Sequence, residues 1–193
     1  MRRSLVQTCL LAALVVASAC GTPPHKEMDQ AQGAIDAARA IGADRYASTE
    51  FAAATTSLKL ADQAVTQRDY RLALNHALES REHAQNAARE AADARARIRG
   101  EVERSMAEVA ALLAQANTLL AAAEKSRVAR RTLTEARSTL AEVNGSVQKA
   151  GAAMKADDYM AAQPALKGVK ERIEAVVTTL DAAVTAQSSR RRR

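Results

Sequence analysis

Aromatic residues are nearly missing from this sequence, which contains no tryptophan, one phenylalanine and three tyrosines. Alanine supplies about half of the hydrophobic residues instead. An alanine side chain favours the helix but hides little apolar area, so we expect closely approaching helices around a thin core. A protein built in this way is expected to be marginally stable.

Proline and glycine are also scarce, with three and seven residues respectively among 193. These residue types interrupt helices most strongly, so their scarcity favours long helices. The length allows one domain of ordinary size or two small ones.

The formal net charge of +6 would suit a nucleic-acid-binding protein, but the excess is confined to the two ends of the chain. Arg2 and Arg3 lie at the start, and the last four residues are all arginine. The chain between them is neutral. A nucleic-acid interface needs basic residues concentrated on one folded surface, so no specific nucleic-acid partner is expected.

Residues 1–19 have the three parts of an export signal. Arg2 and Arg3 form a basic start, and the apolar run Leu10–Ala17 is too short for a bilayer, which needs about 20 residues. Cys9 lies in this leader, so Cys20 is the single cysteine of the mature chain. An internal disulfide is therefore excluded, and an unpaired exported cysteine needs another explanation.

The exit from the leader reads Ala17-Ser18-Ala19-Cys20-Gly21 and resembles the bacterial lipobox. The resemblance implies lipid attachment to Cys20, cleavage between Ala19 and Cys20, and a mature N-terminus that carries acyl chains and binds the membrane. Gly21, where aspartate would indicate inner-membrane retention, implies an outer-membrane lipoprotein facing the periplasm. Ala17 departs from the usual leucine. Ordinary signal peptidase could also cleave here and leave a soluble periplasmic protein.

A tether over residues 20–27 is predicted after the leader. Thr22, Pro23 and Pro24 lie within it, and proline blocks helix propagation. We therefore expect a short extended segment between the lipid and the folded domain.

Apolar residues recur at helical spacing from Met28 onwards. This spacing predicts one helix up to the break at Gly42, a second over 48–65 and a third over 70–124. The third helix is either a single rod or kinked at Gly100.

Two further helices are predicted from strict 3-4 spacing, which is typical of coiled-coil seams. Their seams run over 133–154 and 166–183, and Pro164 should tilt or delay the start of the last helix. The fold class is therefore all-α, an elongated antiparallel bundle of about five helices. The predicted boundaries are 28–99 for an Ala-rich domain, 100–186 for a second hairpin region and 187–193 for a disordered tail.

The dipeptide Asp69-Tyr70 recurs as Asp158-Tyr159, each followed by an alanine three residues after the tyrosine. Each pair separates two amphipathic helices, which suggests two αα-hairpin repeats sharing the long central helix. The aspartate would cap the new helix, and the tyrosine would cover the turn. We call these two turns Asp-Tyr elbows, and we interpret their residues as structural.

Residues 27–98 resemble an uncharacterised Ala-rich domain that is common in bacterial lipoproteins. The segments that carry the resemblance are QGAIDAAR (32–39), FAAATTSLKLADQAV (51–65) and RDYRLALNHALESREHAQNAA (68–88). The resemblance implies an envelope lipoprotein and brings no functional residues with it.

One helix face carries a group of residue types that can bind metals. His76, Glu79 and His83 lie on one helix face, but the histidines are about 10 Å apart by helix rise, too far to share an ion easily. Glu79 and His83 are better interpreted as a solvated i, i+4 pair. No nucleophile motif or phosphate-binding loop is present. We expect no metal, no cofactor and no enzymatic activity.

The sequence thus favours a lipid-anchored periplasmic helical protein with a structural or interaction role, whose partner is another envelope protein or a second copy. The alternative is a peptide-binding module resembling tetratricopeptide repeats, although their tryptophan and Gly-Tyr landmarks are missing. The tail is expected either to contact anionic envelope components weakly or to be solvated without a partner. Its basic residues are Arg190, Arg191, Arg192 and Arg193.

Overall fold

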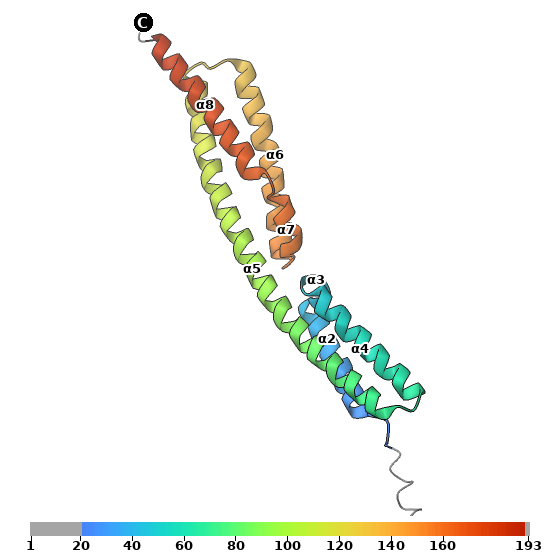
Figure 1. Ribbon diagram of the computed structural model, residues 1–193. Coiled ribbons are helices and arrows are strands. Elements are labelled where there is room, and N and C mark those ends of the chain that lie inside the picture. The colour runs from blue at the N-terminus through green and yellow to red at the C-terminus, as the bar shows by residue number, and fades with distance from the viewer. Residues whose placement is uncertain (1–20, 192–193) are drawn as a thin grey trace, which may run out of the picture. The chain divides into compact units, whose positions relative to one another are not determined.

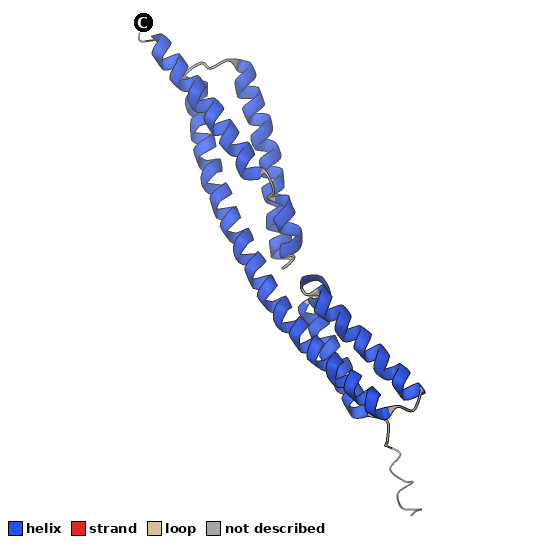
Figure 2. Ribbon diagram, in the orientation of Figure 1, coloured by secondary structure: helices blue, strands red, loops and turns tan. Residues whose placement is uncertain are grey.

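The computed structural model describes residues 21–191, and these are helices joined by short turns, with no strand in that range (Figure 2). The all-α fold class predicted from the sequence is confirmed. The helices are α2 (His25–Ile41), α3 (Ala43–Tyr46), α4 (Ser48–Thr66), α5 (Tyr70–Lys125), α6 (Arg130–Lys155), α7 (Tyr159–Ala165) and α8 (Val169–Arg191).

The chain divides into two compact units, of which unit 1 ends at Ala94 and unit 2 begins at Arg95. Helix α5 contributes its first part to unit 1 and its second part to unit 2 (Figure 1). The unit boundary lies close to the predicted domain boundary between residues 99 and 100. Gly100 lies inside α5 and does not end it.

Unit 1 packs α2, α3 and α4 against α5 through a core made mostly of alanine. Ser80 of α5 is completely buried, and its hydroxyl donates a hydrogen bond to the backbone carbonyl of Ala54 in α4 at 2.8 Å. Such a contact requires the two helices to approach closely, which small side chains allow. The fully buried alanines of this unit are Ala31, Ala38, Ala43, Ala54, Ala61, Ala73, Ala77, Ala84, Ala87 and Ala91.

Unit 2 has a core of larger aliphatic side chains. Figure 1 shows α6 and α8 lying along the second part of α5, and one buried cluster joins the three helices. The 3-4 seams of α6 and α8 face this core as their spacing predicted. Buried members of these seams are Ala136, Leu140, Val143, Ala150, Val169, Ile173, Val176 and Leu180.

Three helices end in the same kind of turn, with one residue other than glycine in the left-handed conformation. These residues are Arg68, Arg127 and Asp157, with φ between 56° and 61°. In each case the following N–H donates to the carbonyl five residues back, which is the long bond of a Schellman motif. The three bonds are Asp69 N to Ala64 O at 2.9 Å, Val128 N to Ala123 O at 3.1 Å, and Asp158 N to Ala153 O at 2.9 Å.

Both ends of the described chain are more helical than the sequence predicted. Helix α2 begins at His25, inside the tether predicted for 20–27. Pro24 precedes the first turn, where proline fits well because the N–H it lacks would have no helical partner. Helix α8 continues to Arg191, into the tail predicted as disordered from residue 187. The hydroxyls of Ser188 and Ser189 donate to carbonyls three residues back, so they do not compete with the helix.

Two short helices were not predicted. Helix α3 follows Gly42, whose φ of 88° ends α2 in the left-handed conformation. Helix α7 contains Pro164 and ends at Ala165, and the chain then passes through Gly168, with φ of 71°, before α8 begins. Pro164 was predicted to tilt or delay the start of the last helix. It lies in the separate helix α7, and the proline and the left-handed glycine together delay the last helix until Val169.

Candidate functional site

The residues predicted for lipid attachment and cleavage, Cys20 and Ala19, lie outside the described residues, as do Arg192 and Arg193. The described chain begins at Gly21, one residue after the predicted attachment point. The surroundings of Gly21 are therefore the part of the described structure nearest in sequence to Cys20.

Residues 21–24 precede α2 and lie against the turn that joins α4 to α5, within unit 1. A Cβ atom added to Gly21 would stand 3.9 Å from Cδ2 of Tyr70, the first residue of α5. An open groove of about 780 Å³ is present at this end of unit 1. Its lining consists of Gly21, Thr22, Pro24, Arg68, Asp69, Tyr70, Arg71 and Leu74.

The groove contains two guanidinium groups and one carboxylate. Asp69 accepts a hydrogen bond from the N–H of Leu72 at 3.0 Å, so its carboxylate serves as the N-cap of α5. Arg68 and Arg71 are both exposed. Within residues 21–191, neither guanidinium forms a hydrogen bond or an ion pair. The groove therefore presents two guanidiniums that are held in no ion pair by the described residues, and one capping carboxylate, so its lining has a net positive charge.

The second elbow, in unit 2, has the same backbone and a different tyrosine. The Asp158 carboxylate accepts from the N–H of Ala161 at 3.1 Å, which repeats the cap made by Asp69. The Tyr159 side chain is only 5% exposed, and its hydroxyl donates to Oδ1 of Asp157 at 2.7 Å. Tyr70, by contrast, is partly exposed at the groove. The two elbows share their turn and cap but place the tyrosine in different surroundings.

Two arginines of α5 cover the ring of Tyr159. The guanidinium carbons of Arg95 and Arg99 lie 5.8 and 5.9 Å from its centre, which is cation–π distance. The hydrogen bond to Asp157 raises the pKa of Tyr159, and burial raises it further, while the two arginines lower it. These contacts hold the second elbow against α5 and leave the Tyr159 side chain almost completely buried.

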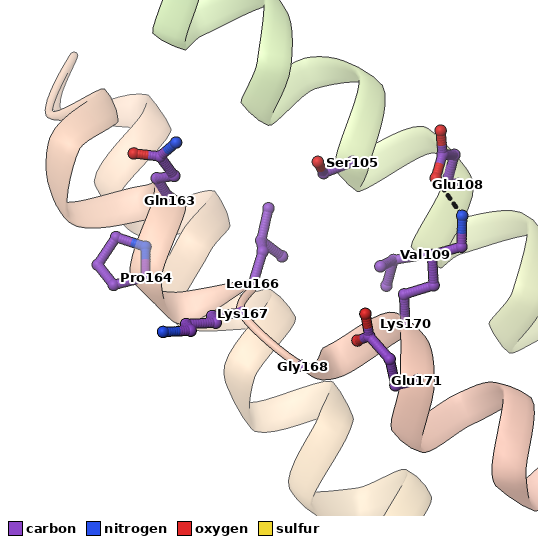
Figure 3. A pocket seen from close by; sticks show the side chains of 10 residues that line it. All are labelled: Ser105, Glu108, Val109, Gln163, Pro164, Leu166, Lys167, Gly168, Lys170 and Glu171. Carbon is purple, nitrogen blue, oxygen red and sulfur yellow. Dashed lines mark hydrogen bonds and ion pairs between the residues drawn. The ribbon is translucent and has the colours of Figure 1, made fainter.

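Figure 3 shows a groove of about 530 Å³ in unit 2, where the chain passes from α7 to α8 beside α5. The ammonium of Lys170 donates to Oε2 of Glu108 at 2.9 Å, and this bond raises the pKa of Lys170. Gln163, which also lines the groove, donates to Glu101 at 3.3 Å. These polar side chains link the helices around the groove to one another.

The histidines pair with glutamates differently from the prediction. His76 Nδ1 lies 2.9 Å from Oε2 of Glu79, and His83 Nδ1 lies 2.8 Å from Oε2 of Glu50 in α4. The predicted pairing of Glu79 with His83 was wrong, because His83 faces a second helix that supplies a closer carboxylate. Across residues 21–191 no three of the metal-binding side chain types gather around a common point.

Helix α5 is long and apolar enough to cross a membrane when only length and composition are considered. Only 17% of its most apolar window is buried. The large apolar side chains of its second part nevertheless pack against the core of unit 2, including Leu112, Leu113, Leu119 and Leu120. In this structure α5 therefore serves as a core helix of unit 2.

Residues 26–102 match a protein family described as Domain of unknown function (DUF4398). This segment comprises α2, α3, α4 and the first part of α5, and it overlaps the 27–98 region in which the sequence resembled an uncharacterised domain. The chain matches no curated protein and no solved structure. The segment that matches this family model is thus an alanine-packed group of helices with an Asp-Tyr elbow.

Proposed function

We propose that the protein is a lipid-anchored helical protein of the bacterial envelope, attached by acyl chains on Cys20 to the outer membrane and facing the periplasm. The observation that carries this proposal is Cys20 itself, which stands directly after an export leader and has no second cysteine in the mature chain to pair with. Several acyl chains on one residue hold a protein firmly, since each buried methylene contributes about 0.8 kcal/mol.

The start of the described chain supports an anchor at this position. Residues 21–24 carry no helix and are followed at once by α2. A lipid on the preceding residue would therefore connect to unit 1 through a very short segment. The anchor would hold the α4–α5 end of this unit next to the membrane.

The role proposed for the helical body is contact with another envelope protein or with a second copy of the chain. Large apolar side chains stand exposed on α2, α4 and α5 of unit 1, and on α7 of unit 2. A packed helix of a partner would remove such side chains from water, which is favourable. They are Ile41, Leu60, Leu72, Leu78 and Met160, each 38–40% exposed.

The anchor is tested by replacing each cysteine in turn and measuring the mass of the mature protein after expression in Gram-negative cells. The wild type and Cys9→Ser should both carry acyl chains and sediment with the outer membrane. Cys20→Ser should lose the lipid mass and leave that fraction. A wild-type protein that begins with an unmodified Cys20 would instead show cleavage by ordinary signal peptidase and would overturn the proposal.

A further inference from the structure

We infer that the groove beside Gly21 is a membrane-contact surface, in which Arg68 and Arg71 bind phosphate groups of the anionic phospholipids that surround the lipid on Cys20. The inference rests on the proposed anchor and goes beyond it. It assigns a ligand of defined chemistry to Arg68 in the α4–α5 turn and to Arg71 in the first turn of α5.

Distance along the chain is the first part of the argument. Gly21 lies against Tyr70, and consecutive Cα atoms are about 3.8 Å apart, so Cys20 is one such step from the groove. The polar layer on each side of the hydrocarbon core is roughly 5–8 Å thick. Acyl chains on Cys20 that enter the hydrocarbon core would therefore hold the groove within the headgroup layer.

The charge of the groove is the second part. Arg68 and Arg71 line it with exposed guanidiniums that form no ion pair with any described residue. A guanidinium matches a phosphate in geometry and can donate two parallel hydrogen bonds to it. The one carboxylate that lines the same groove, Asp69, accepts the cap bond of α5. Two guanidiniums against this one carboxylate leave the lining with a net positive charge, so the groove suits an anionic phosphate better than a cation.

The third observation is an apolar side chain that lines the groove together with these cations. Leu74, one turn along α5 from Tyr70, is partly exposed there. Cationic and apolar groups side by side are typical of surfaces that lie in the membrane interface. Arg68, Arg71 and Leu74 would together hold this end of unit 1 in the headgroup layer.

The test uses the full protein expressed in cells, purified from membranes and placed in vesicles of phosphatidylcholine with or without phosphatidylglycerol. Hydrogen exchange is then measured for peptides that cover residues 66–74. We expect exchange there to slow by roughly fivefold or more when phosphatidylglycerol is present, since each basic residue near an anionic surface is attracted to it. The double variant Arg68→Gln/Arg71→Gln should lose this dependence on lipid charge.

The matched control is Arg97→Gln/Arg130→Gln, which removes the same charge from two exposed arginines of unit 2. It should keep the protection of residues 66–74, and far-UV circular dichroism should show that both double variants remain helical. The inference would be overturned if the acylated protein exchanged at the same rate in residues 66–74 with and without phosphatidylglycerol, or if the loss of Arg68 and Arg71 did not change that rate. Either result would leave the proposed anchor unaffected. A mature protein whose mass shows no acyl chains would overturn both the inference and the anchor.

Discussion

Replacing Ala91 by leucine tests whether the alanine core of unit 1 is as closely packed as its burial indicates. Ala91 in α5 is 0% exposed and packs with alanines of α2 and α3, whereas its neighbour Ala92 is exposed. Leucine adds the same three carbon atoms at either position, and its helix propensity is close to that of alanine. Only at Ala91 must the helices move apart to admit them. Overpacking of this kind costs about 1–3 kcal/mol, while an exposed substitution changes stability by less than about 0.5 kcal/mol.

The two variants, Ala91→Leu and Ala92→Leu, are compared by thermal unfolding followed with far-UV circular dichroism. For a chain of this size a loss of 1 kcal/mol lowers Tm by roughly 2–4 °C, so Ala91→Leu should unfold about 2–12 °C below Ala92→Leu. If the two units unfold in separate steps, the difference should appear in the step of unit 1. Equal Tm values for the two variants would refute the close packing of the alanine core.

Two further predictions concern a pair of glycines and a tyrosine. Gly33→Ala should raise the free energy of unfolding by up to about 1 kcal/mol, because nothing lies within 4 Å of the added Cβ and alanine favours the helix. Gly42→Ala should lower the free energy of unfolding by roughly 1 kcal/mol or more, because φ is 88° there. Chemical denaturation measures the free energy of unfolding of both variants. Equal changes in the two variants would contradict the left-handed conformation of Gly42. The bond to Asp157 favours the neutral phenol of Tyr159, so its stabilisation is present below the ordinary tyrosine pKa of about 10 and is lost as pH rises through the raised pKa. Asp157→Asn should therefore lower the pKa of Tyr159 in a phenolate absorbance titration, and an unchanged titration would show that the bond does not control the pKa.

Helix positions and buried faces could be predicted because they depend on local periodicity. The 3-4 spacing placed Leu140, Val143, Ile173 and Leu180 on buried seams, and all four are buried. The same reasoning identified the turn before Tyr70. Apolar residues recur at a regular spacing along the chain, and a regular helix places residues with this spacing on one face.

Features that depend on one residue's backbone or on a second helix could not be predicted in this way. Gly168 adopts a left-handed conformation and separates α7 from α8, whereas Gly100 lies within α5 and does not interrupt it. The residue type alone does not distinguish these two glycines. The partner of His83 comes from α4, and no local spacing indicates Glu50. The groove arginines, Arg68 and Arg71, were missed for the same reason. Their one signal in the sequence was that they flank the Asp-Tyr elbow.

The difference between the two cores has a consequence for how each unit responds to temperature. Unit 1 buries mainly alanine, whereas unit 2 buries valine, leucine and isoleucine. The heat capacity change of unfolding grows with the apolar area that becomes hydrated. Unit 1 should therefore have the smaller heat capacity change per residue and a flatter dependence of free energy on temperature. Cooling should lower the free energy of unfolding of unit 1 less than that of unit 2, even if unit 1 is the first to unfold on heating.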